Sequence, residues 1–298
     1  MTAPESLLAE ARFVTDALIA EWSDTLAARF ADRDGPAIAY ALASPGKRVR
    51  AALVLASYRA VGGASPAIAG IAAAVETVHT YSLVHDDLPC MDDDNLRRGR
   101  ATTHRAFDVP TATRVGYMLV PVAALVLGRA ARDLHLGPES MGRMAATLFE
   151  AGGIEGMVGG QWMDLEAEQR ILDLEELTAV HRGKTGALIR SACILGGLAG
   201  QATDSQLEAL AGFGEDIGLA FQVADDVLDV TGTSDELGKT AGRDEALQKS
   251  TFVRLMGVEG ARAEAGRLAR RAIDQLDRAG IPSPSLRSLA DYIVSRRS

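Results

Sequence analysis

A long apolar segment that ends in a cluster of aspartates limits what this chain can fold into. Ser65-Pro66 has the pattern of an N-cap followed by proline at the first helical position, and alanine-rich apolar sequence continues from there to Asp87. We expect a long, central helix, because a helix that is apolar on most sides must be buried. Its end carries five aspartates and two arginines within fourteen positions. Buried carboxylates are unfavourable unless cations compensate them.

Composition and helix-start signals predict that the rest of the chain is helical too. Hydrophobic residues make up 47% of the sequence and aromatic residues only 5%, whereas sheets use more β-branched and aromatic residues. Asp173 with Glu176, and Thr203 with Gln206, have capping-box spacing, which predicts the start of two further helices.

The C-terminal third has a predicted loop and two predicted helices. We expect a loop over Gly232–Gly242 and an outer amphipathic helix over Glu259–Ala279. Prolines at 282 and 284 then precede a final helix that ends near Arg297.

The domain organisation follows from length and from the absence of linker-like sequence. A chain of 298 residues is at the upper limit for one hydrophobic core. We predict an all-α fold: residues 1–298 form a single domain, a bundle of about ten or more helices around a central cavity.

Charge and cysteine content limit the partners and the location. A net charge of −9 argues against nucleic acid but allows phosphorylated small molecules if cations are recruited locally. Cys90 and Cys193 do not form a disulfide framework. The apolar run Val115–Gly128 contains Pro121 and is too short to span a bilayer. We expect a cytoplasmic protein with no signal peptide and no stable membrane insertion.

The first aspartate cluster lies where the central helix should break. On an ideal helix Asp86 and Asp92 would not share a face, because six residues turn by about 600°. Pro89 should interrupt the helix, and a bulge of two residues would bring Asp92 back beside Asp86. The break therefore makes a chelate possible.

A second aspartate cluster lies on a helix that we expect to line a cavity. Asp225 and Asp229 are spaced i,i+4 and so share one face, with Gln222 one turn before Asp225. Magnesium is commonly held by one or two carboxylates plus substrate phosphates. A single cluster has the plainer interpretation of a solvated acidic helix end. Two facing clusters with basic residues between them are suited to clamping a diphosphate through several ions.

With these clusters and further motifs in order, the sequence resembles the trans-isoprenyl diphosphate synthases (polyprenyl synthetases), particularly the bacterial farnesyl and geranylgeranyl diphosphate synthases. The resemblance covers nearly the whole chain. The matching segments are 46–50, 76–79, 86–99, 159–165, 184–186, 221–229, 238–239, 249–251 and the basic C-terminus.

The resemblance implies a fold of the isoprenoid synthase type, a homodimer, and a magnesium-dependent prenyl transfer between isopentenyl diphosphate and an allylic diphosphate. Asp86, Asp92 and Asp225 would ligate three magnesium ions, supported by Asp87, Asp226 and Asp229. The allylic diphosphate would be held by Arg97, Lys184 and Lys239. Isopentenyl diphosphate would be held without metal by Lys47, Arg50, His79 and Arg98. Thr185 and Gln222 would line the reaction centre, and with Lys184 and Arg97 they would form the catalytic set.

The chain departs from the family pattern at three positions. Ala51 stands where proline is usual, Asn95 where aspartate is common, and Tyr117 where aspartate is typical. None of these removes a proposed metal ligand.

Product length is predicted from the residues before the first cluster. Tyr81 precedes Asp86 by five residues, about 7.5 Å lower along a helix, and Ser82 beside it is small. In the resembled family an aromatic residue here accompanies fifteen-carbon products. We therefore predict farnesyl diphosphate, with geranylgeranyl diphosphate as the alternative.

Three other functions compete with this interpretation. A class I terpene cyclase shares the fold but would pair its aspartate motif with an Asn/Ser/Glu-type second motif. A di-iron bundle would require two Glu-x-x-His motifs, and only Glu76 to His79 fits. A non-catalytic subunit of a heteromeric synthase would commonly have lost aspartates from one cluster, and this chain keeps both.

Overall fold

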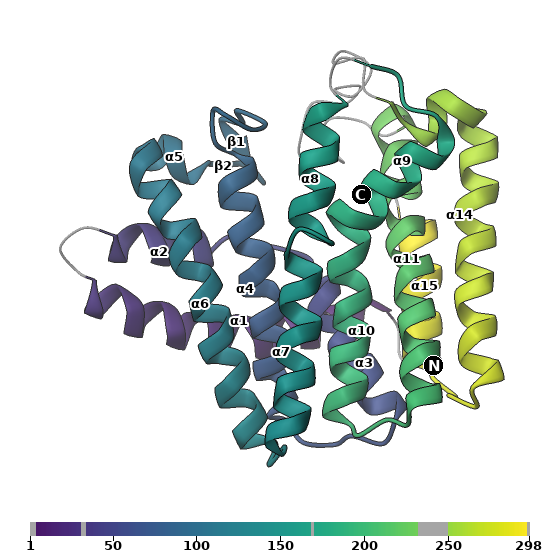
Figure 1. Cartoon of the computed structure of the whole chain (residues 1–298), viewed down its shortest axis with the longest axis horizontal. Helices are drawn as coiled ribbons and strands as arrows, with labels where there is room; N and C mark the ends of the chain where they lie inside the picture. Colours follow the sequence, from purple (N-terminus) through teal and green to yellow (C-terminus); the bar gives the residue numbers. More distant parts are fainter. Residues whose placement is uncertain (1–3, 31–33, 168–169, 232–249, 297–298) are drawn as a thin grey trace. The chain divides into compact units, whose positions relative to one another are not determined.

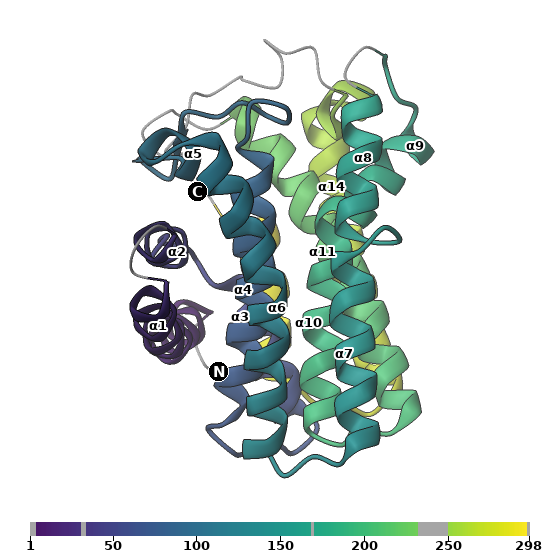
Figure 2. The same cartoon turned by 60° about the vertical axis from the view of Figure 1, so that its left-hand side comes forward.

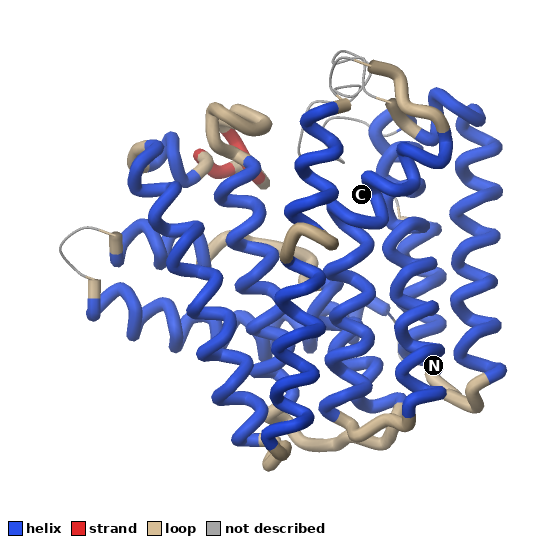
Figure 3. Tube along the Cα trace, in the orientation of Figure 1, coloured by secondary structure: helices blue, strands red, loops and turns tan. Residues whose placement is uncertain are grey.

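The computed structural model describes residues 4–30, 34–167, 170–231 and 250–296. Within these ranges most of the chain is helical (Figures 1 and 3). The described part has only one pair of strands, a short antiparallel hairpin of β1 (Leu96–Arg97) and β2 (Arg100–Ala101). The predicted all-α class is therefore confirmed.

The chain divides into two compact units. The first contains Glu5–Leu55 and Ser65–Ala145, and the second contains Ala56–Ala64 and Ala146–Ser298. Two of the boundaries fall inside α3 (Val49–Ala60) and α7 (Pro138–Gly152), and another follows Ala64, between α3 and α4 (Ile68–Asp86).

The core of the first unit is built by two long helices that pack along each other, α4 and α6 (Figure 2). Gly70 permits the close approach, because a Cβ at this position would lie 2.6 Å from the Cβ of Ala130. Besides the hairpin and parts of α3 and α7, the helices of this unit are α1 (Pro4–Arg29), α2 (Gly35–Leu42), α4 (Ile68–Asp86), α5 (Thr103–Ala106) and α6 (Val109–Asp133).

Helix α6 is longer than the apolar run that predicted it. Asp108 caps it early, since its side chain accepts a hydrogen bond from the Thr111 N–H at 2.6 Å. By length and composition α6 is the one helix in the described ranges that is able to cross a membrane. Half of its apolar window is buried inside the protein, and it packs along α4. We therefore interpret α6 as a core helix, as predicted for the run around Pro121.

The second unit is organised around α11, which packs against both α10 and α14 (Figure 1). Its core includes Leu219 and Val223 of α11 with Phe252 and Leu268 of α14. Besides parts of α3 and α7, the helices of this unit are α8 (Met157–Glu166), α9 (Leu174–His181), the π-helix η1 (Arg182–Gly186), α10 (Ala187–Ala199), α11 (Asp204–Thr231), α14 (Phe252–Arg278) and α15 (Pro284–Ser295).

Both predicted capping boxes are confirmed. The Asp173 side chain accepts from the Glu176 N–H at 2.9 Å, and the Glu176 side chain accepts from the Asp173 N–H at 3.1 Å. Thr203 and Gln206 exchange the corresponding bonds at 3.3 and 3.0 Å. These pairs satisfy N–H groups that a helix start leaves without partners, and so they fix where α9 and α11 begin.

The π-helix depends on glycines that allow close backbone contact. A Cβ on Gly160 of α8 would lie 2.0 Å from the backbone nitrogen of Lys184. A Cβ on Gly218 of α11 would lie 2.8 Å from the Gly186 Cα. π-helical turns occur frequently at functional sites. Here the turn carries Lys184 and Thr185 between two packed helices.

A buried carboxylate joins α11 to α14. Asp216 is 2% exposed; it accepts from Arg271 Nε at 2.7 Å and from Gln275 Nε2 at 2.8 Å. We predict that Asp216→Ala lowers the free energy of unfolding by about 2–3 kcal/mol, the magnitude typical of hydrogen bonds to charged groups. Urea denaturation measures this change, with Glu208→Ala at an exposed position of α11 as control. Equal stability of the two variants would contradict the prediction.

Candidate active site

The chain after α4 folds back on itself at the first aspartate cluster. The helix ends at Asp86, and the Asp92 N–H donates to the Asp86 carbonyl oxygen at 2.8 Å. Asp93 has a φ of +47° in the same turn. The predicted return of the chain is therefore confirmed for the backbone, which brings residues 86 and 92 together despite their six-residue spacing.

Asp87 is held by an arginine of the hairpin. Arg97 Nε lies 2.6 Å from Asp87 Oδ1, and the Asp87 side chain is 5% exposed. Arg98 and Gly99 form the hairpin turn with φ angles of +53° and +76°, as a type I′ turn requires. The turn thereby places Arg97 beside the helix end that carries the aspartates.

Burial raises the pKa of Asp87 to about 6, although Arg97 opposes this shift. Asp94 and Asp92 raise the pKa further through like-charge repulsion. The carboxylates at this helix end are therefore only partly compensated by Arg97. Such a site favours binding of an additional cation.

The hairpin is attached to the segment before α3. Tyr40 Oη donates to the Ala101 carbonyl at 2.6 Å, and the Arg100 guanidinium lies 4.2 Å from the centre of the Tyr40 ring. Arg98 donates to the Pro45 carbonyl oxygen. These contacts fix Arg98 next to the Gly46–Arg50 motif.

A group of guanidinium side chains surrounds His79 on α4. His79 is half-buried, and burial together with four nearby positive charges lowers its pKa well below the usual value. In decreasing order of effect these charges belong to Arg50, Arg98, Arg97 and Arg48. Three of the residues predicted to hold isopentenyl diphosphate therefore lie in one electrostatic environment; Lys47, the fourth, is exposed.

Glu76 anchors the segment that carries these basic residues. It is 2% exposed; its Oε2 lies 3.3 Å from Arg48 Nη1, and its Oε1 accepts from the Ala51 N–H at 3.1 Å. Proline at position 51 would have no N–H to donate. Ala51, which departs from the family pattern, thus supplies an N–H through which Glu76 holds the start of α3. The sequence did not reveal this role of Glu76.

The aromatic residues near the predicted chain-length position contact one another. Tyr81 meets the His85 ring edge to face at 5.1 Å, and His85 meets Tyr117 of α6 at 5.6 Å. Gly116 leaves room for His85, because a Cβ there would lie 1.9 Å from His85 Nε2. Tyr117 therefore makes a contact between helices. The Ser82 hydroxyl donates to the His79 carbonyl at 2.9 Å.

In the second unit three predicted residues line one pocket of about 140 Å³: Lys184, Gln222 and Asp226. Lys184 Nζ lies 2.6 Å from Asp164 Oδ2, an acid of α8 in the same pocket. Thr185, which follows Lys184 in η1, is not part of the lining.

The second aspartate cluster separates into one accessible and two buried carboxylates. The Asp225 side chain is 41% exposed and lies 2.5 Å from Arg296 Nη2. Asp226 and Asp229 are buried, and Asp226 Oδ2 accepts from the Phe252 N–H at 2.7 Å. Asp226 therefore caps the start of α14, which agrees with a supporting role. Lys239 lies outside the described residues.

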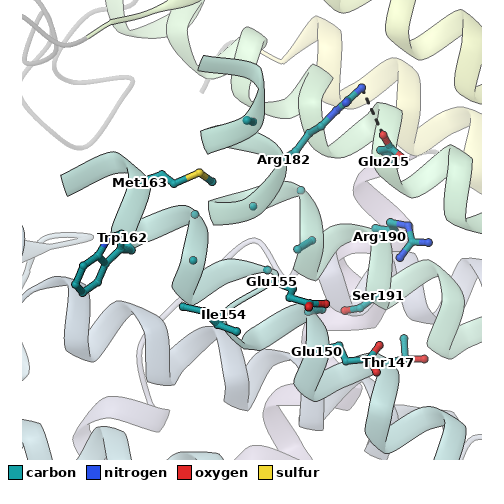
Figure 4. Close-up of a pocket in the computed structure, with 18 of the residues that line it drawn as sticks. Thr147, Glu150, Ile154, Glu155, Trp162, Met163, Arg182, Arg190, Ser191 and Glu215 are labelled. Carbon is teal, nitrogen blue, oxygen red and sulfur yellow. Dashed lines mark ion pairs between the residues drawn. The ribbon is translucent and has the colours of Figure 1, made fainter. Parts of the chain in front are cut away.

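A larger cavity, of about 800 Å³, lies beside η1 in the same unit (Figure 4). Its lining includes Gly183 and Gly186 on either side of Lys184, but none of the predicted site residues. The Arg182–Glu215 ion pair, at 3.4 Å, is part of this lining. Of the two pockets, it is the smaller one that is lined by residues predicted for the site.

The carboxylates suit magnesium better than a metal held by protein alone. In the ranges that the structure describes, no three acidic, histidine or cysteine side chains form a complete metal-binding group. Magnesium accepts such a site, because it takes oxygen ligands from one or two carboxylates and completes its shell with water and phosphate. Within the first unit Asp86 and Asp92 offer oxygen ligands of this kind, and within the second unit Asp225 does.

Comparisons with known proteins show the family to which the chain belongs. A model of the polyprenyl synthetase family matches residues 35–279. The chain is 45% identical to a farnesyl diphosphate synthase of Escherichia coli, over 84% of this chain and 85% of the relative. It is 42% identical to a chloroplastic heterodimeric geranylgeranyl pyrophosphate synthase large subunit of Arabidopsis thaliana, over 88% and 72%.

A solved structure extends the similarity to three dimensions. The geranyltransferase of Helicobacter pylori, complexed with magnesium and isoprenyl diphosphate, matches with a TM-score of 0.80 and 31% identity, covering 99% of this chain and 97% of that one. The chain is therefore an all-α enzyme that transfers prenyl groups. It belongs to the polyprenyl synthetase family, whose members are magnesium-dependent.

Four residues of the site were missed by sequence reasoning: Glu76, Asp164, His181 and Arg296. The first two lie within motifs that the resemblance used, Glu76-Thr77-Val78-His79 and Gly159 to Leu165, which was the available signal. Their partners are 28 and 20 residues away along the chain. Arg296 is 71 residues from Asp225, and no spacing rule links such pairs.

The raised pKa of Asp87 gives a pH dependence of stability. The folded-state pKa of about 6 exceeds the usual aspartate pKa of 3.8, so proton binding favours the folded state. This contribution is complete below pH 4 and is lost as the pH rises through 6. We predict that the free energy of unfolding of the metal-free protein falls, relative to Asp87→Asn, by up to about 3 kcal/mol between pH 4 and 7. Chemical denaturation at several pH values with a chelator present measures this. If the difference in unfolding free energy between the two proteins does not change with pH, the raised pKa of Asp87 is contradicted.

Proposed function

We propose that this prenyltransferase condenses isopentenyl diphosphate with dimethylallyl or geranyl diphosphate and releases farnesyl diphosphate, with geranylgeranyl diphosphate as the alternative product. The observation that carries the proposal is that the chain has two kinds of site at which a diphosphate can bind. One is a carboxylate-rich helix end that needs a cation, and the other is the guanidinium group around His79. The name of the E. coli relative supports the fifteen-carbon product, and that of the Arabidopsis relative supports the alternative.

Asp86, Asp92 and Asp225 would hold the allylic diphosphate through three magnesium ions, with Asp87, Asp226 and Asp229 in support. The magnesium in the H. pylori neighbour supports this choice of metal. When bound, magnesium neutralises the charge that builds on the leaving diphosphate. Arg97, Lys184 and Lys239 add fixed positive charge at the same oxygens.

Isopentenyl diphosphate would bind without metal at Arg50, His79 and Arg98, with Lys47 at the rim. The lowered pKa of His79 keeps its imidazole neutral, so the ring donates one hydrogen bond and the guanidinium groups supply the charge. The double bond of isopentenyl diphosphate then attacks the allylic cation. Gln222 and Thr185 stabilise this cation with their dipoles, and the released diphosphate takes the final proton.

We further propose that residues 1–298 act as one domain, because the family match over residues 35–279 runs through both units, and that the protein is a cytoplasmic homodimer. The family relationship supports the dimer. Tyr117 and Leu125 of α6, which are 65% and 60% exposed, provide apolar surface for it.

Purified chain incubated with labelled isopentenyl diphosphate, each allylic starter and magnesium tests the function. We expect turnover by the chain alone, and a loss of roughly 10²-fold or more in Asp86→Ala and Asp225→Ala, because each removes a major electrostatic element. Asp291→Ala, at an exposed position of α15, serves as control. No turnover by the chain alone favours the non-catalytic subunit, and near-normal rates in both variants contradict the metal assignment.

The chain-length prediction has its own test. Tyr81→Ala removes a half-buried ring from α4, and we expect products of twenty carbons or more because the ring no longer limits the length of the growing prenyl chain. Tyr81→Phe keeps the ring and its contact with His85, so its product should remain at fifteen carbons. Chromatographic sizing of the prenyl products distinguishes the two. An unchanged profile in Tyr81→Ala would remove Tyr81 from this role.

A further inference from the structure

The amide of Gln222 is held by a histidine that the proposed chemistry does not use. Gln222 Nε2 lies 3.3 Å from His181 Nδ1. His181 is the last residue of α9, and Gln222 belongs to α11. Both side chains are half-buried and line the 140 Å³ pocket together with Lys184. The pair therefore lies among the residues assigned to the reaction.

The chemistry of the two groups fixes their orientation. An amide nitrogen donates and does not accept hydrogen bonds, so His181 Nδ1 must be the acceptor. The His181 ring is then neutral and carries its proton on Nε2. Gln222 Oε1 is left on the opposite side of the amide from His181. The Gln222 amide nitrogen is thereby anchored to His181, and the carbonyl oxygen, which is the negative end of the amide dipole, points away from His181.

The His181 ring is itself held in place. It stacks on Phe252 with ring centres 5.6 Å apart and an angle of 27° between the planes. Phe252 is 1% exposed, and its N–H is bound by Asp226 of the second aspartate cluster. On its other side along the chain, His181 directly precedes the π-helix that carries Lys184. One helix end thus positions both a catalytic cation and a catalytic amide.

We propose that His181 is a positioning residue for prenyl transfer: its Nδ1 holds the Gln222 amide so that the carbonyl oxygen faces the allylic cation. The proposal rests on the role given to Gln222 under the proposed function. Without an acceptor at this position the amide can turn over and present its N–H₂ group, the positive end of the dipole, to a developing positive charge. That arrangement would raise the barrier to ionisation and leave the diphosphate contacts intact.

Two variants separate hydrogen bonding from packing. His181→Phe keeps a ring that can stack on Phe252 but removes the acceptor, whereas His181→Asn keeps an acceptor near the Nδ1 position and loses the stack. We expect His181→Phe to lower kcat by about 10-fold, less than the roughly 10²-fold cost of displacing a catalytic group by about 1 Å, with little change in KM for either diphosphate. His181→Asn should retain most of the turnover. The opposite order would show that the ring acts by packing and would overturn the proposal.

A double variant tests whether His181 acts through Gln222. If it does, adding His181→Phe to Gln222→Ala lowers kcat no further, whereas independent effects multiply. Thermal unfolding of each variant confirms that the proteins compared are folded. If Gln222→Ala has a low kcat while His181→Phe keeps the full kcat, the His181 proposal is overturned and the role of Gln222 stands. Full turnover in Gln222→Ala removes the role of Gln222 from the proposed function, and the His181 proposal with it.

Discussion

The structure depends on how carboxylates at the ends of apolar helices are compensated. A buried or half-buried carboxylate is unstable without a hydrogen-bond or charge partner. Asp87 has Arg97, Asp226 has the Phe252 N–H, Asp164 has Lys184, and Asp225 has Arg296. Each partner comes from a different element: the hairpin, the start of α14, the π-helix and the end of α15. The acidic groups thus depend on the surrounding fold, and of these four the Asp225 side chain is the most exposed, at 41%.

Local signals predicted the helices well and tertiary contacts poorly. The capping boxes fixed the starts of α9 and α11, and the central helix ends within one residue of the expected Asp87. Its predicted start at Ser65-Pro66 was wrong, since α4 begins at Ile68 and Ser65 Oγ instead accepts from the Ala67 N–H at 3.2 Å in the preceding turn. The outer helix expected from Glu259 begins at Phe252, with a break at Gly257. The reason is that Thr251 caps α14 earlier, by accepting from the Arg254 N–H at 3.1 Å. The π-helix was not predicted, because it depends on Gly160 and Gly218 in neighbouring helices.

For the site, residue types were predictable and partners were not. Aspartate pairs, basic residues and Gln222 stand out in the sequence because they interrupt apolar helices. The anchoring groups do not stand out. Glu76 looks like an ordinary polar residue on α4, although it binds both Arg48 and the Ala51 N–H. His181 looks like the polar end of a short helix, although its ring lies between Gln222 and Phe252. These roles arise from long-range packing, which composition and spacing do not encode.

The two anion sites also suggest why one diphosphate would ionise while the other stays intact. Around His79 the charge comes from guanidinium groups, and the nearby Glu76 is committed to Arg48 and α3. Such a site binds a diphosphate by direct hydrogen bonds. At the aspartates the protein supplies negative charge, so a diphosphate can bind only together with divalent cations, which also stabilise it as a leaving group. Under the proposed function, the sign of the fixed charge at each site therefore decides which substrate loses its diphosphate.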